Sequence, residues 1–167
     1  SFVWMSDVAG GTGNREGVIY AGGMWDFAKN DGYLRMDEQY AVDVFNTFYV
    51  DGRYLIPIDD KTSVTLRAQY YPQTSVGDEQ IGSFSTYGVG LQAAVGHGPV
   101  EAQLYYTQTG SGYSTQAPFG VHASYLSMMS SDFNSAGEKA WGLGANVNFS
   151  GLGAPGPGGP TAALEAS

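Results

Sequence analysis

An all-β, antiparallel fold is predicted by long alternating segments, by joints of alternating length and by few charged residues. Apolar and β-branched runs between turn signals lie at 17–27, 44–57, 63–73, 84–96, 100–108 and 139–150, with a further fragment at 1–9. The joints at 58–62 and 97–99 are tight, and those at 28–43, 74–83 and 109–138 are long. Tight turns at one end and long loops at the other are the plan of an up-and-down transmembrane β-barrel. The sequence therefore predicts part of a barrel wall, with about six or seven strands.

Each segment is interpreted as a strand because its side chains alternate between an apolar and a polar side. The alternation is clearest in 63–73, 100–108 and 139–150 and less regular in 44–57. The segments run to roughly 9–14 residues, and a tilted membrane strand needs about 9–11. Strands of soluble proteins cluster near about 5–6 residues. Length therefore favours a membrane wall over a β-sandwich.

Aromatic residues near the segment ends predict girdles at the two membrane interfaces. Ordinary β-propensity is the alternative explanation, because Tyr and Phe favour any strand. The candidates are Trp25, Phe27, Tyr54, Tyr70, Tyr71, Phe84, Tyr105, Trp141 and Phe149.

Composition excludes several classes of function. Charged residues make up 14% of the chain, well below the roughly 25% of soluble domains. The net charge of −9 argues against a nucleic-acid partner, which requires clustered Lys and Arg. The chain has no cysteine and no recognisable catalytic or metal-binding motif. We therefore expect no enzyme activity, no metal and no cofactor.

The polar side of the segments holds the candidate functional residues. Arg53 and Arg67 fall on the inward sides of neighbouring strands, and counting outward from the tight turn at 58–62 places them across from one another. Inward arginines attract anionic groups and hold carboxylates with two hydrogen bonds. The predicted pore-lining, solute-binding residues are Arg53, Arg67, Gln69, Gln92, Glu101 and Gln103.

Several motifs are shared with one known family. In chain order they are FNTFYVDGRY at 45–54 with Pro57, AQYYPQ at 68–73 with Gly77-Asp78, AGEKAW at 136–141 and NFSGLG at 148–153. Together they resemble the OprD-type outer-membrane porins. The similarity covers most of residues 17–156 and is closest to the C-terminal half of such a porin.

The resemblance implies a large monomeric barrel of about 18 strands in the outer membrane of a Gram-negative bacterium. Its partners would be the lipid bilayer, lipopolysaccharide and small anionic or zwitterionic solutes. Members of the family import small nutrients, often carboxylates, along a ladder of basic side chains, and Arg53 and Arg67 are the candidate rungs here.

We expect residues 1–156 to be part of the barrel and residues 157–167 to be a disordered or out-of-family tail. The Gly/Pro-rich stretch GAPGPGGP at 153–160 is unsuited to sheet pairing. Because about six or seven strands do not close a barrel of about 18, the chain is interpreted as a fragment of a longer porin.

Two other readings stay open at the level of sequence. One is a soluble, secreted β-sandwich that binds glycans through Tyr and Trp, with shorter strands and two packed sheets. The other is a non-channel envelope β protein, such as an enzyme or adhesin barrel, which would need a pore plugged by large side chains or a convergent polar site. The small residues expected on the inward side, Gly88, Gly90, Gly142 and Gly144, argue against plugging.

Overall fold

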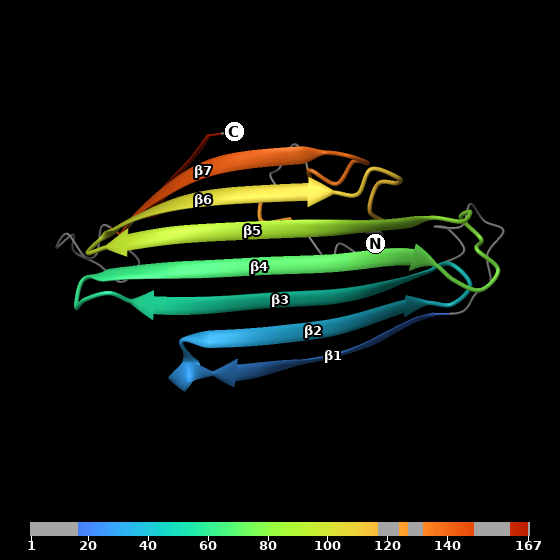
Figure 1. Cartoon of the computed structure of the whole chain (residues 1–167), viewed down its shortest axis with the longest axis horizontal. Helices are drawn as coiled ribbons and strands as arrows, with labels where there is room; N and C mark the ends of the chain where they lie inside the picture. Colours follow the sequence, from blue (N-terminus) through green and yellow to red (C-terminus); the bar gives the residue numbers. More distant parts are fainter. Residues whose placement is uncertain (1–16, 117–123, 127–131, 149–160, 167) are drawn as a thin grey trace.

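The computed structural model describes residues 17–116, 124–126, 132–148 and 161–166. They form one sheet in which every strand pairs with the next along the chain (Figure 1). All neighbouring pairs are antiparallel. The predicted fold class is confirmed, with eight strands among the described residues. They are β1 (Val18–Phe27), β2 (Gly32–Ala41), β3 (Phe45–Pro57), β4 (Thr62–Ser75), β5 (Ser85–His97), β6 (Val100–Thr109), β7 (Lys139–Asn148) and β8 (Thr161–Ala166).

Connections at the two ends of the sheet differ in length. At one end, on the left in Figure 1, β1 joins β2 through the short helix η1 (Ala28–Asn30), and β5 joins β6 through two residues. Gly98 in that two-residue turn has φ +57°, a conformation that glycine adopts without strain and that tight hairpins require. At the other end, the connections at 76–84 and 110–138 are longer. The predicted contrast between a turn end and a loop end is confirmed for these connections only. The connection at 42–44, at the loop end, has three residues, and the connection at 149–160, at the turn end, has twelve.

A single aspartate shapes the tight turn between β3 and β4. Asp59 Oδ1 accepts hydrogen bonds from the backbone N–H groups of Lys61 and Thr62, each at 2.8 Å. Asp favours turns because its side chain can bond to the backbone in this way. The two donors hold the pKa of Asp59 below its ordinary value, with the Lys61 N–H as the largest cause.

The prediction of a long loop at 28–43 is wrong, because Gly32–Ala41 forms β2. This strand carries Arg35, Asp37 and Glu38, and such charges made the stretch look like a loop. Its alternation is nevertheless regular, since Asp37 and Gln39 are buried whereas Met36 and Tyr40 are exposed. Charged side chains are compatible with a strand when one of its faces lines a polar interior.

The C-terminal expectation needs a similar correction. Thr161–Ala166 forms β8, which pairs with β7 from Asn148↔Thr161 to Leu143↔Ala166. The disorder expected for 157–167 is therefore wrong for these six residues. The candidate strand at 1–9 and the Gly/Pro-rich stretch at 153–160 lie outside the described residues.

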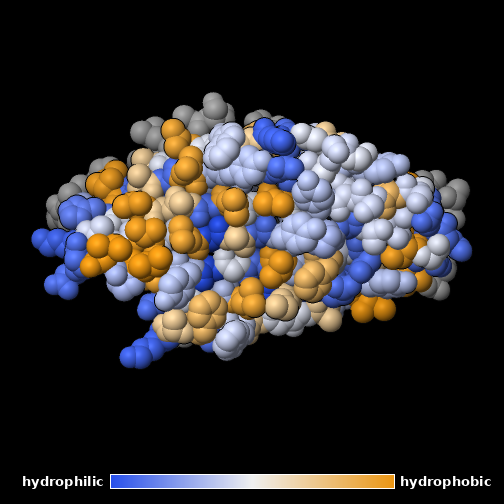
Figure 2. Space-filling view, in the orientation of Figure 1, coloured by the Kyte–Doolittle hydropathy of each residue, from blue (hydrophilic) through white to orange (hydrophobic). Residues whose placement is uncertain are grey.

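The sheet has one apolar face and one polar face, as alternation requires. We call the apolar side the outward face; many of its large apolar side chains are exposed, and they gather over the strands in Figure 2. The segment containing Tyr125 and Leu126 lies against the other side, the inward face. Exposed apolar residues of the outward face include Trp25, Met36, Phe48, Tyr54, Leu66, Tyr70, Leu91, Val95, Leu104, Trp141 and Leu143.

Aromatic rings form contacts on the outward face near both ends of the sheet. Near the turn end, the Phe27 ring lies 5.3 Å from that of Trp25 and 6.1 Å from that of Tyr54, centroid to centroid. On the loop side of the sheet, the rings of Tyr106 and Trp141 lie 4.5 Å apart. These arrangements are typical of interfacial girdles.

Three girdle assignments are wrong. Tyr71 and Tyr105 face inward, because each adjoins an outward-facing tyrosine and neighbouring residues of a strand point to opposite faces. Phe84 packs with Ala41, Val44 and Phe45 in a buried cluster at the loop end. Phe149 lies outside the described residues.

The inward glycines make room for neighbouring side chains and leave no open space above themselves. A Cβ at Gly88 would meet the ring of Tyr71, and one at Gly90 would meet Gln69. At Gly142 it would meet Leu126 of the 110–138 connection, and at Gly144 it would come within 3.3 Å of Gln103 and Tyr105. The interpretation of these glycines as a sign of an unplugged interior is therefore corrected.

Helices contribute little to the described parts of the chain. None of those found there has the length and apolar character to cross a membrane.

Gly88→Ala is expected to destabilise the barrel, because the added methyl group would overlap the Tyr71 ring. Overpacking of this kind costs about 1–3 kcal/mol of folding free energy. Urea denaturation of the full-length protein in micelles measures the effect. Gly23→Ala is the control, since a Cβ there has no atom within 4 Å. An equal midpoint for the two variants would refute the close packing of Tyr71 on Gly88.

Candidate functional site

The inward face brings three of the six predicted site residues, Arg53, Arg67 and Gln92, together in one row. Arg53 lies directly across from Arg67, and Arg67 lies across from Gln92. Gln92 in turn pairs with Tyr105, and Arg53 pairs with Tyr33. The predicted opposition of the two arginines is thus confirmed. Directly opposed like charges destabilise a strand pair, so their placement points to a function.

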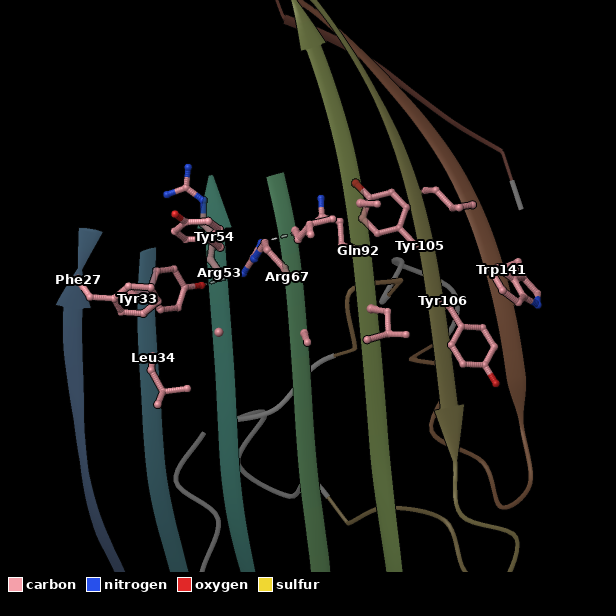
Figure 3. A pocket seen from close by; sticks show the side chains of 16 residues that line it. Phe27, Tyr33, Leu34, Arg53, Tyr54, Arg67, Gln92, Tyr105, Tyr106 and Trp141 are labelled. Atoms are coloured by element: carbon pink, nitrogen blue, oxygen red, sulfur yellow. Dashed lines mark hydrogen bonds between the residues drawn. The ribbon is translucent and has the colours of Figure 1, made fainter. Parts of the chain in front are cut away.

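Arg67 is positioned by long, weak contacts with three side chains. Its Nη1 donates to Gln92 Oε1 at 3.4 Å and its Nη2 donates to the Tyr33 hydroxyl at 3.3 Å, the dashed lines in Figure 3. Its guanidinium carbon lies 4.7 Å from the centroid of the Tyr125 ring, which attracts a cation through its π face. Its buried Nε has no hydrogen-bond acceptor among the described residues.

Arg53 has fewer partners than Arg67. Its side chain is partly exposed. Among the described residues, no hydrogen bond or ion pair involves its guanidinium group. A positive charge beside Arg67 is therefore left available to a solute.

Among the described residues, Asp51 is the only carboxylate that forms hydrogen bonds with the tyrosines around Arg67, and it already accepts from two of them. Asp51 accepts a hydrogen bond from the Tyr33 hydroxyl at 2.7 Å and another from the Tyr125 hydroxyl. Burial raises the pKa of the Tyr125 phenol above its ordinary value, and the hydrogen bond to Asp51 adds to the shift. Tyr125 therefore stays protonated and remains a donor. Asp51 fixes the two tyrosines that contact Arg67.

Gln69 lies one row nearer the loop end than Arg67. It pairs with Asp51, and its Oε1 accepts a hydrogen bond from the Tyr49 hydroxyl at 3.1 Å. Only 3% of Gln69 is exposed, so it supports the wall more than it lines free space.

Glu101 and Gln103 lie toward the turn end and belong to a separate chain of hydrogen bonds along β6. The Tyr105 hydroxyl donates to Gln103, and Gln103 donates to Glu101. Glu101 Oε1 also accepts from Asn146 Nδ2 at 3.3 Å. This chain of hydrogen bonds ends at Tyr105, which belongs to the row of Arg53 and Arg67.

Sequence reasoning missed a third inward arginine because it missed β2. Arg35 Nε lies 2.5 Å from Asp37 Oδ2, and Arg35 Nη2 donates to the Tyr20 hydroxyl at 3.0 Å. Its guanidinium carbon is 5.8 Å from the centroid of the Tyr49 ring. The alternation of β2 was the signal that could have identified it.

Charge is distributed unequally between the two faces of the described strands β1–β7. The outward face carries only Glu38 and Lys139, both close to the loop end. The inward face carries Asp26, Arg35, Asp37, Asp51, Arg53, Arg67 and Glu101. Within the described ranges, no group of three or more His, Asp or Glu side chains is arranged to hold a metal ion. The arrangement suits reversible contact with a charged solute.

Fold and faces together define the wall of an outer-membrane-type β-barrel: next-neighbour antiparallel strands, an apolar exterior and a polar interior. A protein-family model described as "outer membrane porin, OprD family" matches residues 4–161. The chain belongs to the OprD family of outer membrane porins. Its location is accordingly the bacterial outer membrane. A search of curated protein sequences found no match.

Solved porins of Pseudomonas aeruginosa share the fold. OpdK, solved with vanillate, superimposes with a TM-score of 0.75 at 20% identity, over 83% of this chain and 37% of its own. OprD superimposes with a TM-score of 0.72 at 22% identity, over 79% of this chain and 35% of its own. OccK2 (OpdF), solved in complex with glucuronate, superimposes with a TM-score of 0.73 at 16% identity, over 83% of this chain and 38% of its own. The chain therefore spans little more than a third of the length of these neighbours.

The β-sandwich alternative is not supported. A sandwich needs two packed sheets, whereas the described strands form a single sheet with an exposed apolar face.

Tyr125→Phe is expected to lower the free energy of unfolding by about 1.5–3 kcal/mol, the range for a hydrogen bond to a charged group. The change removes the donor to Asp51 and keeps the ring beside Arg67. Denaturant titration of the full-length porin measures it. Tyr113→Phe is the control, because Tyr113 is 51% exposed and its hydroxyl has no partner within the described ranges. Equal losses in the two variants would contradict the role of Tyr125.

Proposed function

We propose that this chain is part of a porin that admits small anionic or zwitterionic solutes, carboxylates above all, across the outer membrane by passive diffusion. The observation that carries the proposal is the pair Arg53 and Arg67, opposed across two strands of the inward face. No covalent chemistry and no cofactor take part, so the porin is not an enzyme. Selectivity comes from pore width and lining charge.

A carboxylate fits this pair for reasons of geometry and charge. Guanidinium groups present forked N–H donors that match the two oxygens of a carboxylate. An anion between them relieves the repulsion of two like charges that face each other in the empty channel. The nearest bonded acid, Asp51, is already engaged with two tyrosine hydroxyls, so it competes weakly for the guanidinium groups.

The remaining predicted residues have supporting roles in this proposal. Gln92 sets the position of Arg67 through a hydrogen bond, and Gln69 stiffens the wall beside Asp51. Glu101 and Gln103 lie nearer the turn end, where the carboxylate of Glu101 favours the cationic part of a zwitterionic solute. All six predicted residues thus act on one solute path.

Two structural neighbours support the solute class. OpdK was solved with vanillate and OccK2 with glucuronate, and both compounds are carboxylates. We extend that class to this chain through Arg53 and Arg67, not through overall identity.

The parent protein is proposed to be a monomeric barrel of about 18 strands, to which β1–β8 contribute wall strands. The two open edges of the described sheet, at β1 and β8, call for further strands, because unpaired backbone is costly in hydrocarbon. Its surroundings are the bilayer and the lipopolysaccharide of the outer leaflet.

Arg67→Glu in the full-length porin is expected to shift ion selectivity toward cations and to slow carboxylate entry, because the opposed pair becomes one of mixed charge. The reversal potential in planar bilayers under a salt gradient measures the first effect, and liposome swelling with a small monocarboxylate measures the second.

Arg67→Lys is the matched control. It keeps the positive charge but loses the fork that bonds Tyr33 and Gln92, so selectivity is expected to stay near that of the parent while carboxylate entry weakens. Unchanged ion selectivity and unchanged carboxylate entry in Arg67→Glu would contradict the proposed role of this residue.

A further inference from the structure

The outward face contains a groove that the channel function does not explain. It has a volume of about 600 Å³ and is almost entirely apolar, and this volume falls in the range of small-ligand pockets, roughly 300–1,000 Å³. Its lining includes the small outward residues Gly52, Ala68 and Ala93. It also includes residues of the inward row that runs between the two outward rows, namely Tyr33, Arg53, Arg67, Gln92 and Tyr105. Leu34, Leu66 and Leu91, whose large side chains line the groove, belong to the outward face of β2, β4 and β5, which places the groove on that face.

Strand register explains why the groove exists. Two adjacent rows of outward residues cross the sheet, and each contains small residues between large ones. In the first row, Gly52 and Ala68 lie between Leu34 and Leu91. In the second, Ala93 lies between Leu66 and Leu104. Because Gly52, Ala68 and Ala93 are smaller than their neighbours, the surface is hollowed where these two rows cross the sheet.

The groove runs obliquely between the two ends of the wall. It begins at Phe27, the last residue of β1 beside the turn end, and reaches Trp141, the third residue of β7 beside the loop end. At its first end the stacked rings of Phe27 and Tyr54 mark a membrane interface. A long, flexible, apolar ligand fits this path better than a compact one.

We propose that this groove, defined by Gly52, Ala68 and Ala93 and their large neighbours, seats one acyl chain of a phospholipid. The groove is continuous with the surface that the outer-membrane family presents to the bilayer, so hydrocarbon is what reaches it. The headgroup lies at the Phe27–Tyr54 ring stack, and the chain crosses the wall toward Trp141.

Charge favours a phospholipid over a lipopolysaccharide as the occupant. The phosphorylated headgroup of lipopolysaccharide calls for clustered cations. The outward face of β1–β7 carries a single cation, Lys139, at the loop end. The turn end of the groove offers aromatic rings instead, which suit the headgroup level of an ordinary lipid.

Native mass spectrometry of the full-length porin, extracted in mild detergent and reloaded with phosphatidylethanolamine, tests the proposal. The parent is expected to retain one phospholipid, and the double variant Ala68→Phe/Ala93→Phe is expected to lose it because the new rings fill the groove. Ala102→Phe/Ala145→Phe is the control, since both alanines are exposed on the same face but do not line the groove. Channel conductance should match the parent in both, which separates this test from that of the channel.

Photocrosslinking gives a second readout that requires no substitution. A phospholipid with a photoactivatable acyl chain should label residues around Leu66 and Leu91 in preference to Leu143. Labelling spread evenly over the outward face would overturn the proposal, as would a parent that retains no lipid. Retained lipopolysaccharide, or dimers that disappear in the groove-filled variant, would overturn it by identifying a different occupant.

Discussion

Backbone hydrogen bonding in hydrocarbon is the constraint on which this structure depends. Within a bilayer, each unpaired N–H or C=O costs several kcal/mol, so each strand must pair along most of its length with both neighbours. The continuous antiparallel pairing from β1 to β7 meets that requirement with ten to fourteen residues per strand. The open edges at β1 and β8 do not meet it, which explains why this wall requires the rest of a barrel.

Once the strands are paired, alternation decides everything else about the wall. Neighbouring residues point to opposite sides, so Leu66 and Ala68 face lipid while Arg67 and Gln69 face the interior. Removal of apolar surface from water then stabilises only the outward half of each strand. The inward half can therefore carry charged groups that lower the stability of the sheet, and the directly opposed Arg53 and Arg67 are the clearest example. Inward glycines absorb the bulk of Tyr71 and Leu126, so that rings and a loop segment pack against the wall.

Strand positions and the opposition of Arg53 and Arg67 could be predicted from the sequence because both follow from local pattern. The period-two alternation fixes the face of each residue, and the tight turn at 58–61 fixes the register of β3 and β4. β2 was missed because its inward face is charged, and Arg35 was missed with it. The contacts of Tyr125 with Asp51 and Arg67 join residues distant in sequence, and no local pattern of one sequence encodes such a contact. The pairing of β8 after a Gly/Pro-rich stretch is likewise a tertiary outcome that composition argued against.

Single-cysteine scanning along β4 tests the central claim, that one face meets lipid and the other meets the water-filled interior. This chain contains no cysteine. Thr65, Leu66, Arg67 and Ala68 are each replaced in turn in a full-length porin whose cysteines elsewhere, if present, are changed to serine, and the variants are studied in vesicles. Cysteines at 65 and 67 should react with a membrane-impermeant maleimide. Those at 66 and 68 should resist it and carry labels that lipid-soluble quenchers reach. Uniform reactivity along the four positions, or the opposite phase, would contradict the account.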